Sequence, residues 1–126
     1  MASAREDYLI RMLKEMSAIL RRLRERLAGA SGEEARAPAE LAAIGRETDD
    51  AIAQLLGEKA GVLRMLDAAT AARLVGRFET VTLWADFVRV QGEAARLTGD
   101  TAAAASLLAR ADALDDAARR AWPEAR

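Results

Sequence analysis

Residues 5–28 read REDYLIRMLKEMSAILRRLRERLA, and this stretch decides the fold class. No Pro or Gly interrupts it, and large apolar residues recur at alternating intervals of four and three residues. Such a heptad spacing predicts one long helix with a continuous apolar stripe. With a rise of about 1.5 Å per residue, the helix is expected to be about 36 Å long. The stripe consists of Leu9, Leu13, Met16, Leu20, Leu23 and Leu27.

The composition extends this prediction to the whole chain. Of its 126 residues, 31 are Ala and only 4% are aromatic. Ala, Leu, Arg and Glu favour helices, whereas the β-branched and aromatic residues that favour strands are scarce. We therefore expect an all-α fold, a bundle of about five to six helices in a single domain over residues 1–126.

Gly and Pro residues divide the chain after the first helix. Residues 29–76 are expected to form connecting helices, because Pro38 suits the first turn of a helix, and Gly57 and Gly76 suit the left-handed residue that ends one. Asp67 is suited to cap the last of these helices. The predicted helices cover residues 38–56, 58–66 and 67–76.

Residues 77–122 are predicted to form a helical hairpin. Gly99 and Asp100 separate two long helical patterns, and Pro123 ends the second. A connection of two residues forces the second helix to run antiparallel to the first. The helix expected over 77–98 has one packing face, which comprises Leu83, Trp84, Phe87, Val88, Gln91, Ala94 and Ala95.

This hairpin resembles a tetratricopeptide-type repeat. Gly92 precedes the Gly99-Asp100 turn by seven residues, and small and large residues follow the turn at the spacing of that family. The resemblance implies that small residues let the two helix axes approach to about 8–10 Å. Ala95 departs from the pattern, since the repeat usually has an aromatic residue there. The residues assigned to hairpin packing are Trp84, Phe87, Gly92, Gly99, Ala104, Leu108 and Ala111.

The start of the chain carries a second resemblance. Residues 7–11 read DYLIR. Together with the hairpin, they resemble an uncharacterised bacterial family whose members begin with Asp-Tyr-Leu-x-Arg and end in a tetratricopeptide-like hairpin. The resemblance implies an architecture and carries over no catalytic or binding residue. A fainter copy of the repeat is expected upstream, with its turn at Gly32 and Glu33.

The sequence encodes no familiar catalytic machinery. The chain has no Cys and no His, which excludes thiolate nucleophiles, thiolate zinc sites and imidazole bases. Its eight Gly form no phosphate-binding loop. The acidic clusters at 47–50 and 112–116 are interpreted as solvated surface rather than as a site for a hard cation. We therefore expect no enzyme activity, no cofactor and no metal.

Charge and hydropathy bear on the partners. The chain has 19 Lys and Arg against 20 Asp and Glu, so no net positive charge directs it to nucleic acid. The exception is the basic stretch RRLRER at 21–26, for which contact with nucleic acid or anionic lipid is an alternative hypothesis. We recognise neither a membrane-spanning run nor a signal peptide, and so expect no membrane span and a cytoplasmic location.

The apolar stripe over residues 9–27 leads to the functional hypothesis. Left exposed, each of its six large side chains would forgo about 1.5–3 kcal/mol of burial, so the stripe must be covered. Either the chain covers it as core, or a second protein does. The sequence favours a protein–protein interaction module, an adaptor or self-assembling scaffold that forms a homodimer through this stripe. The other alternative is a module for an apolar small molecule, with a pocket lined by Met12, Met16, Met65, Trp84 and Phe87.

Overall fold

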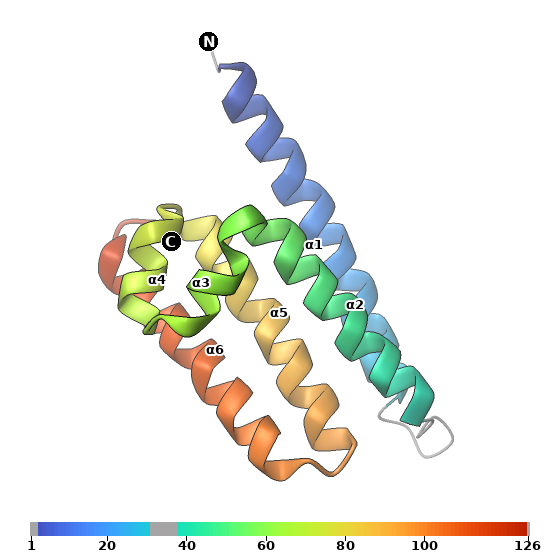
Figure 1. The fold of residues 1–126 in the computed structure, drawn as a ribbon. Coiled ribbons are helices and arrows are strands. Elements are labelled where there is room, and N and C mark those ends of the chain that lie inside the picture. Colours follow the sequence, from blue (N-terminus) through green and yellow to red (C-terminus); the bar gives the residue numbers. More distant parts are fainter. Residues whose placement is uncertain (1–2, 31–37, 126) are drawn as a thin grey trace.

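The computed structural model describes residues 3–30 and 38–125, and every regular element in these two ranges is helical (Figure 1). The elements are α1 (Ala4–Ala30), α2 (Pro38–Leu56), the 3₁₀ segment η2 (Gly57–Lys59), α3 (Ala60–Met65), α4 (Ala68–Val75), α5 (Phe78–Leu97) and α6 (Thr101–Ala121). The predicted all-α fold is confirmed. Within the described ranges, no helix is both long enough and apolar enough to cross a membrane.

Local sequence signals explain where the helices end. Pro38 is the first residue of α2, where its missing N–H leaves no hydrogen bond unmade. Gly57 and Gly76 have φ values of 70° and 78°, which side chains with a Cβ rarely adopt. Asp67 caps α4, because its carboxylate accepts a hydrogen bond from the backbone N–H of Thr70 at 3.0 Å.

The long helices form two antiparallel pairs that lie side by side, α1 with α2 and α5 with α6 (Figure 1). Helix α5 is central, since it contacts α1, α2, α4 and α6. Helices α2 and α6 flank α5 on either side, and the short helices α3 and α4 connect the two pairs at one end. The turn predicted at Gly32 and Glu33 lies outside the described residues.

One hydrophobic core joins the long helices and the two short ones. Its largest fully buried side chains include Trp84 and Phe87 of α5, Met16 of α1 and Ile44 of α2. The core also contains the hydroxyl of Thr48, which donates to the carbonyl oxygen of Ile44 at 2.6 Å. The buried polar atom is therefore satisfied within its own helix.

Helices α5 and α6 are in very close contact. A Cβ added at Gly92 of α5 would lie 2.7 Å from Cδ2 of Leu108, on α6. Gly99 forms the turn with φ 88°, and the carboxylate of Asp100 accepts a hydrogen bond from the N–H of Ala103 at 3.1 Å, which caps α6. The predicted antiparallel hairpin is present, and its relation to tetratricopeptide repeats stays a prediction.

Candidate functional site

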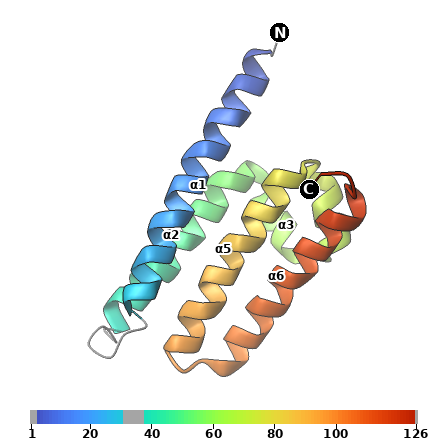
Figure 2. The ribbon, with the colours of Figure 1, turned by 180° about the vertical axis from the view of Figure 1, so that it is seen from behind.

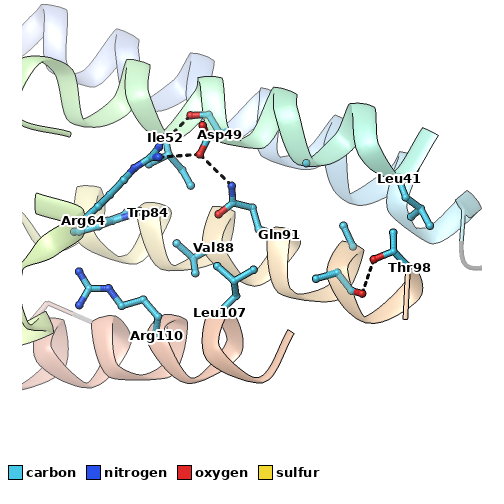
Figure 3. Close-up of a pocket in the computed structure, with 13 residues that line it drawn as sticks. Leu41, Asp49, Ile52, Arg64, Trp84, Val88, Gln91, Thr98, Leu107 and Arg110 are labelled. Carbon is cyan, nitrogen blue, oxygen red and sulfur yellow. Dashed lines mark hydrogen bonds and ion pairs between the residues drawn. The ribbon is translucent and has the colours of Figure 1, made fainter. Parts of the chain in front are cut away.

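A groove with a volume of about 520 Å³ lies over α5, between α2 and α6 (Figure 3). We call it the central groove. Helix α5 and its C-cap contribute Trp84, Val88, Gln91, Ala94, Ala95 and Thr98. The other helices contribute Leu41, Gly45, Asp49 and Ile52 from α2, Leu107 and Arg110 from α6, and Arg64 from α3.

Helical periodicity places these residues on common faces. Along α2 and along α5, the lining residues follow one another mostly at intervals of three and four, which is the spacing of neighbours on one side of a helix. The face predicted for residues 77–98 therefore supplies both the core and the floor of the groove. From Trp84 to Thr98 the floor spans fifteen residues, which at a rise of 1.5 Å per residue places the two ends about 21 Å apart.

Small residues keep the groove open. A Cβ built at Gly45 of α2 meets no atom within 4 Å, so this helix presents bare backbone to open space. On α5, Ala94 and Ala95 line the same stretch and add only methyl groups. Within this stretch the lining carries no charged side chain beyond Asp49, and space is left beside Gly45, Ala94 and Ala95.

Charged groups lie toward the other end of the groove, where Figure 3 shows Arg64 and the guanidinium of Arg110 near Trp84. Arg64 and Asp49 form an ion pair at 2.9 Å. Asp49 also accepts a long hydrogen bond from the amide nitrogen of Gln91 at 3.4 Å. The carboxylate of Asp49 is thus paired with Arg64 of α3 and hydrogen-bonded to Gln91 of α5.

Arg110 differs from Arg64, because it forms no ion pair with a carboxylate of residues 3–30 or 38–125. Its guanidinium carbon lies 5.4 Å from the centre of the Trp84 ring, and one N–H donates to the carbonyl oxygen of Leu63 at 3.1 Å. Burial lowers the pKa of Arg110, and the charge of Asp67 opposes this shift. The group still remains a cation at neutral pH, since an arginine does not lose its proton in proteins.

The six residues predicted as an interface fall into a buried group and a half-buried group. Met16, Leu20 and Leu23 are buried in the core, whereas Leu9, Leu13 and Leu27 are half-buried. The interface prediction is wrong for the three buried residues, because the chain itself covers them. The first turns of α1 extend beyond the other helices (Figures 1 and 2), and there Tyr8 and Ile10 are 59% and 47% exposed.

The residues assigned to hairpin packing lie at or near the contact between α5 and α6. Trp84, Phe87, Ala104 and Ala111 are buried. The remaining three are Gly92 and Leu108, which touch across the helix pair, and Gly99 in the turn.

The pocket predicted for an apolar ligand has a different lining. Met16 and Phe87 are fully buried, Met65 is 87% exposed, and Met12 packs at the edge of the core. Only Trp84 of the predicted set lines the central groove. The predicted lining is therefore wrong. It was chosen for the flexibility of methionine side chains, which does not indicate which faces of the helices meet.

The sequence-based reasoning did not single out Arg110, although the chain carries a signal for it. Residues three and four positions away on either side are Leu107, Ser106, Ala113 and Leu114, and none is acidic. By contrast, Arg89, Arg96 and Arg119 each have an acidic residue three positions before them and pair with it. Arg110 therefore has no ion-pair partner within its own helix, a feature that it shares with Arg73.

The charged stretches are largely engaged within the chain. In the basic stretch, Arg24 pairs with Asp86 at 3.5 Å, and Arg26 pairs with Glu40 and Glu47. In the acidic cluster at 112–116, Asp112 and Asp115 both bind Arg89. Across residues 3–30 and 38–125, no group of three or more carboxylates is arranged to hold a metal ion.

Comparisons of the chain with protein-family models, with curated proteins and with solved structures found no match. The resemblance to a bacterial family with an Asp-Tyr-Leu-x-Arg start therefore stays a prediction.

Proposed function

We propose that the protein is a non-enzymatic binding module that holds a small molecule with an extended apolar portion in the central groove. The observation that supports this most is the groove itself, a mainly apolar channel of about 520 Å³ with two arginines toward one end. Ligand pockets have volumes of about 300–1,000 Å³ and this same division between apolar walls and few polar groups.

The chemistry of the lining residues favours binding over catalysis. The groove has one hydroxyl group among its described residues, on Thr98, and it donates to the carbonyl oxygen of Ala95 at 2.7 Å. The one carboxylate, on Asp49, is paired with Arg64. Neither group is positioned as an activated nucleophile with an adjacent base.

The test fills the groove without disturbing the core. Gly45→Leu places a side chain in open space and replaces a poor helix former with a good one, so the variant is expected to fold. Gly29→Leu is the matched control, because Gly29 lies on α1, outside the groove, and its Cβ also meets no atom within 4 Å. Binding of 1-decanol is followed by the fluorescence of Trp84, with Trp122→Phe as the background.

We expect the parent and Gly29→Leu to bind decanol equally and Gly45→Leu to bind it at least tenfold more weakly. Circular dichroism confirms that each variant is folded. Equal binding by all three proteins, or no binding by any of them, would overturn the proposed function.

Self-association is a second candidate function, and the exposed start of α1 favours it. Beside Leu9 and Met12, a hollow of about 600 Å³ reaches Leu74 and Val75 of α4. Leu74 is exposed, as are Tyr8 and Ile10 on the extended turns of α1. Ile10 lines a separate hollow with Leu13 and Lys14, so the described part of the chain leaves apolar side chains uncovered on more than one side of α1.

We propose that a second copy of the chain covers these turns. If a two-fold axis passes at Ile10 between antiparallel copies of α1, Glu6 of each copy lies opposite Lys14 of the other, since both are four residues from Ile10. Such an arrangement is self-complementary in charge, as a two-fold interface requires. Ile10 would then meet its own counterpart at the centre.

Light scattering coupled to size exclusion, over a series of concentrations, tests the dimer. Ile10→Glu is expected to give a monomer, and the exposed Val62 on α3 provides the control Val62→Glu. Glu6→Lys should weaken the dimer, and combining it with Lys14→Glu should restore it. A monomeric parent at all concentrations, or a dimer unaffected by Ile10→Glu, would contradict the proposal.

A further inference from the structure

The central groove carries one cation that forms no ion pair with the described chain. Of its three charged lining residues, Asp49 and Arg64 neutralise each other at 2.9 Å. Arg110 has no such partner among residues 3–30 and 38–125. The groove lining therefore has a net charge of +1, and this charge lies at one end of an otherwise apolar channel.

The charge of Asp67 acts on Arg110, but the carboxylate of Asp67 is hydrogen-bonded to Thr70. Asp67 raises the pKa of Arg110 through its charge, but forms no ion pair with it. Its carboxylate instead accepts two hydrogen bonds from Thr70, at 2.7 Å from the hydroxyl and 3.0 Å from the backbone N–H. Asp67 is thus held as the cap of α4, and its charge acts on Arg110 without forming an ion pair with it.

The guanidinium of Arg110 is held in a defined position. The ring of Trp84 lies against it at 5.4 Å, and the carbonyl oxygen of Leu63 accepts one of its five N–H groups. Four donors remain for a ligand, and two parallel N–H groups of a guanidinium match the two oxygens of a carboxylate. Because the group is half-buried, pairing with an anion there is less screened by water than at the surface.

The groove extends from this cation in one direction. In Figure 3, Arg110 and Trp84 lie toward one end and Leu41 and Thr98 at the other, with Val88 and Leu107 between them. A ligand with its head group on Arg110 would therefore lay an apolar chain along α5, past Val88 and Leu107 and over Ala94 and Ala95.

We propose that the ligand of the central groove is an amphipathic anion, a long-chain carboxylate whose head group pairs with Arg110 and whose chain lies along α5 toward Thr98. This inference rests on the proposed function, because it requires that the groove bind an apolar chain. It adds the charge of the ligand and its direction in the groove.

Three ligands with the same ten-carbon chain separate the head group from the tail: decanoate, 1-decanol and decyltrimethylammonium. Each is titrated into the Trp122→Phe protein below its micelle concentration and followed by Trp84 fluorescence. We expect decanoate to bind at least tenfold more tightly than decanol, and the cation to bind most weakly. Arg110→Gln should remove the advantage of decanoate and leave decanol binding unchanged.

Arg120→Gln is the matched control, because Arg120 is exposed on the same helix and lies outside the central groove. It changes the net charge equally and should leave all three affinities unchanged. Arg110→Lys keeps the charge but loses the planar pair of donors, so it should retain part of the preference for decanoate.

The two proposals fail in distinguishable ways. If decanol does not bind, or if Gly45→Leu has no effect on its binding, the proposed function is overturned. If decanol binds in the groove but decanoate binds no better, or if Arg110→Gln leaves decanoate binding unchanged, only the anionic ligand is overturned.

Discussion

Two glycines inside long helices show how differently the two sides of the molecule are built. Gly92 of α5 faces α6, and a Cβ there would lie 2.7 Å from Leu108. Gly45 of α2 faces the central groove, and a Cβ there would meet nothing within 4 Å. Glycine is required for close helix packing at position 92, whereas at position 45 it leaves open space. Identical substitutions at the two sites therefore separate tight packing from an open groove.

The largest effect is expected from Gly92→Ala. The new methyl group would overlap Cγ and Cδ2 of Leu108 and approach its backbone nitrogen at 3.3 Å, so either the Leu108 side chain or the helix pair must shift. Overpacking of this kind costs about 1–3 kcal/mol of unfolding free energy. Urea denaturation of the parent and the variant measures the difference.

A second variant identifies the cause of that loss. If the overlap with Leu108 is responsible, Gly92→Ala should cost much less in a Leu108→Ala background, and the double-mutant cycle should show a coupling above about 0.5 kcal/mol. An additive result would mean that the close contact between α5 and α6 is not what requires Gly92.

A smaller loss is expected from Arg89→Gln, which tests the polar side of the same helix pair. Arg89 donates to Asp86 of α5 at 2.9 Å and to Asp115 of α6 at 2.7 Å. Burial raises the pKa of Asp86, and the charge of Arg24 opposes this rise. Removing Arg89 leaves Asp86, Asp112 and Asp115 without their shared cation, while Arg24 still pairs with Asp86. We expect a loss of about 1 kcal/mol, which decreases at high salt.

Arg96→Gln is the control for this substitution, because Arg96 pairs only with Glu93 within α5. Its loss should stay below about 0.5 kcal/mol. Equal losses for the two variants would show that the contacts of Arg89 across the helix pair add nothing to stability.

Gly45→Ala should stabilise the protein, whereas Gly92→Ala should destabilise it. The methyl group enters open space, and replacing Gly by Ala inside a helix gains about 0.5–1 kcal/mol. Thermal and urea unfolding of the two alanine variants, measured side by side, compare the packing of the two sites directly. A loss of stability in Gly45→Ala would mean that α2 lies closer to its neighbours than the structure indicates.

The smallest effect at neutral pH is expected at the end of the groove, from Asp67→Asn. Hydrogen bonds from the Thr70 hydroxyl and N–H hold the pKa of Asp67 below its usual value. Because the folded state binds this proton less tightly than the unfolded state, the stabilisation is present above about pH 4 and is lost as the pH falls through the lowered pKa.

Asn also caps helices, so the variant should match the parent at pH 7 and lose less stability on acidification. Urea midpoints measured between pH 7 and pH 2.5 test this. An unchanged acid dependence would mean that Asp67 does not contribute to it.

The helices could be predicted because their boundaries depend on local chemistry. Gly57, Gly76 and Gly99 adopt left-handed conformations that few other residues tolerate, and Asp67 and Asp100 cap the helices that follow them. The close contact at Gly92 was also expected, because a small residue at a fixed distance from a short turn faces the partner helix.

The groove could not be predicted in the same way. Its lining joins α2, α3, α5 and α6, and which faces of these helices meet depends on packing between segments far apart in the sequence. The heptad stripe shows the same limit, since Met16 and Leu20 fit equally well into a core or an interface. Only the position of α2 and α5 beside α1 decides that they are buried.

The two-residue turn at Gly99 and Asp100 also affects the order in which the fold assembles. Helices α5 and α6 are neighbours in sequence, so closing this pair costs little chain entropy, whereas α2 must reach α5 across the segment from 57 to 77. Amide protons of α5 and α6 should therefore exchange only on global unfolding, and those of α2 through an earlier, partial opening. A partial opening of this kind would remove the α2 wall of the central groove, while α5 and α6 stay together.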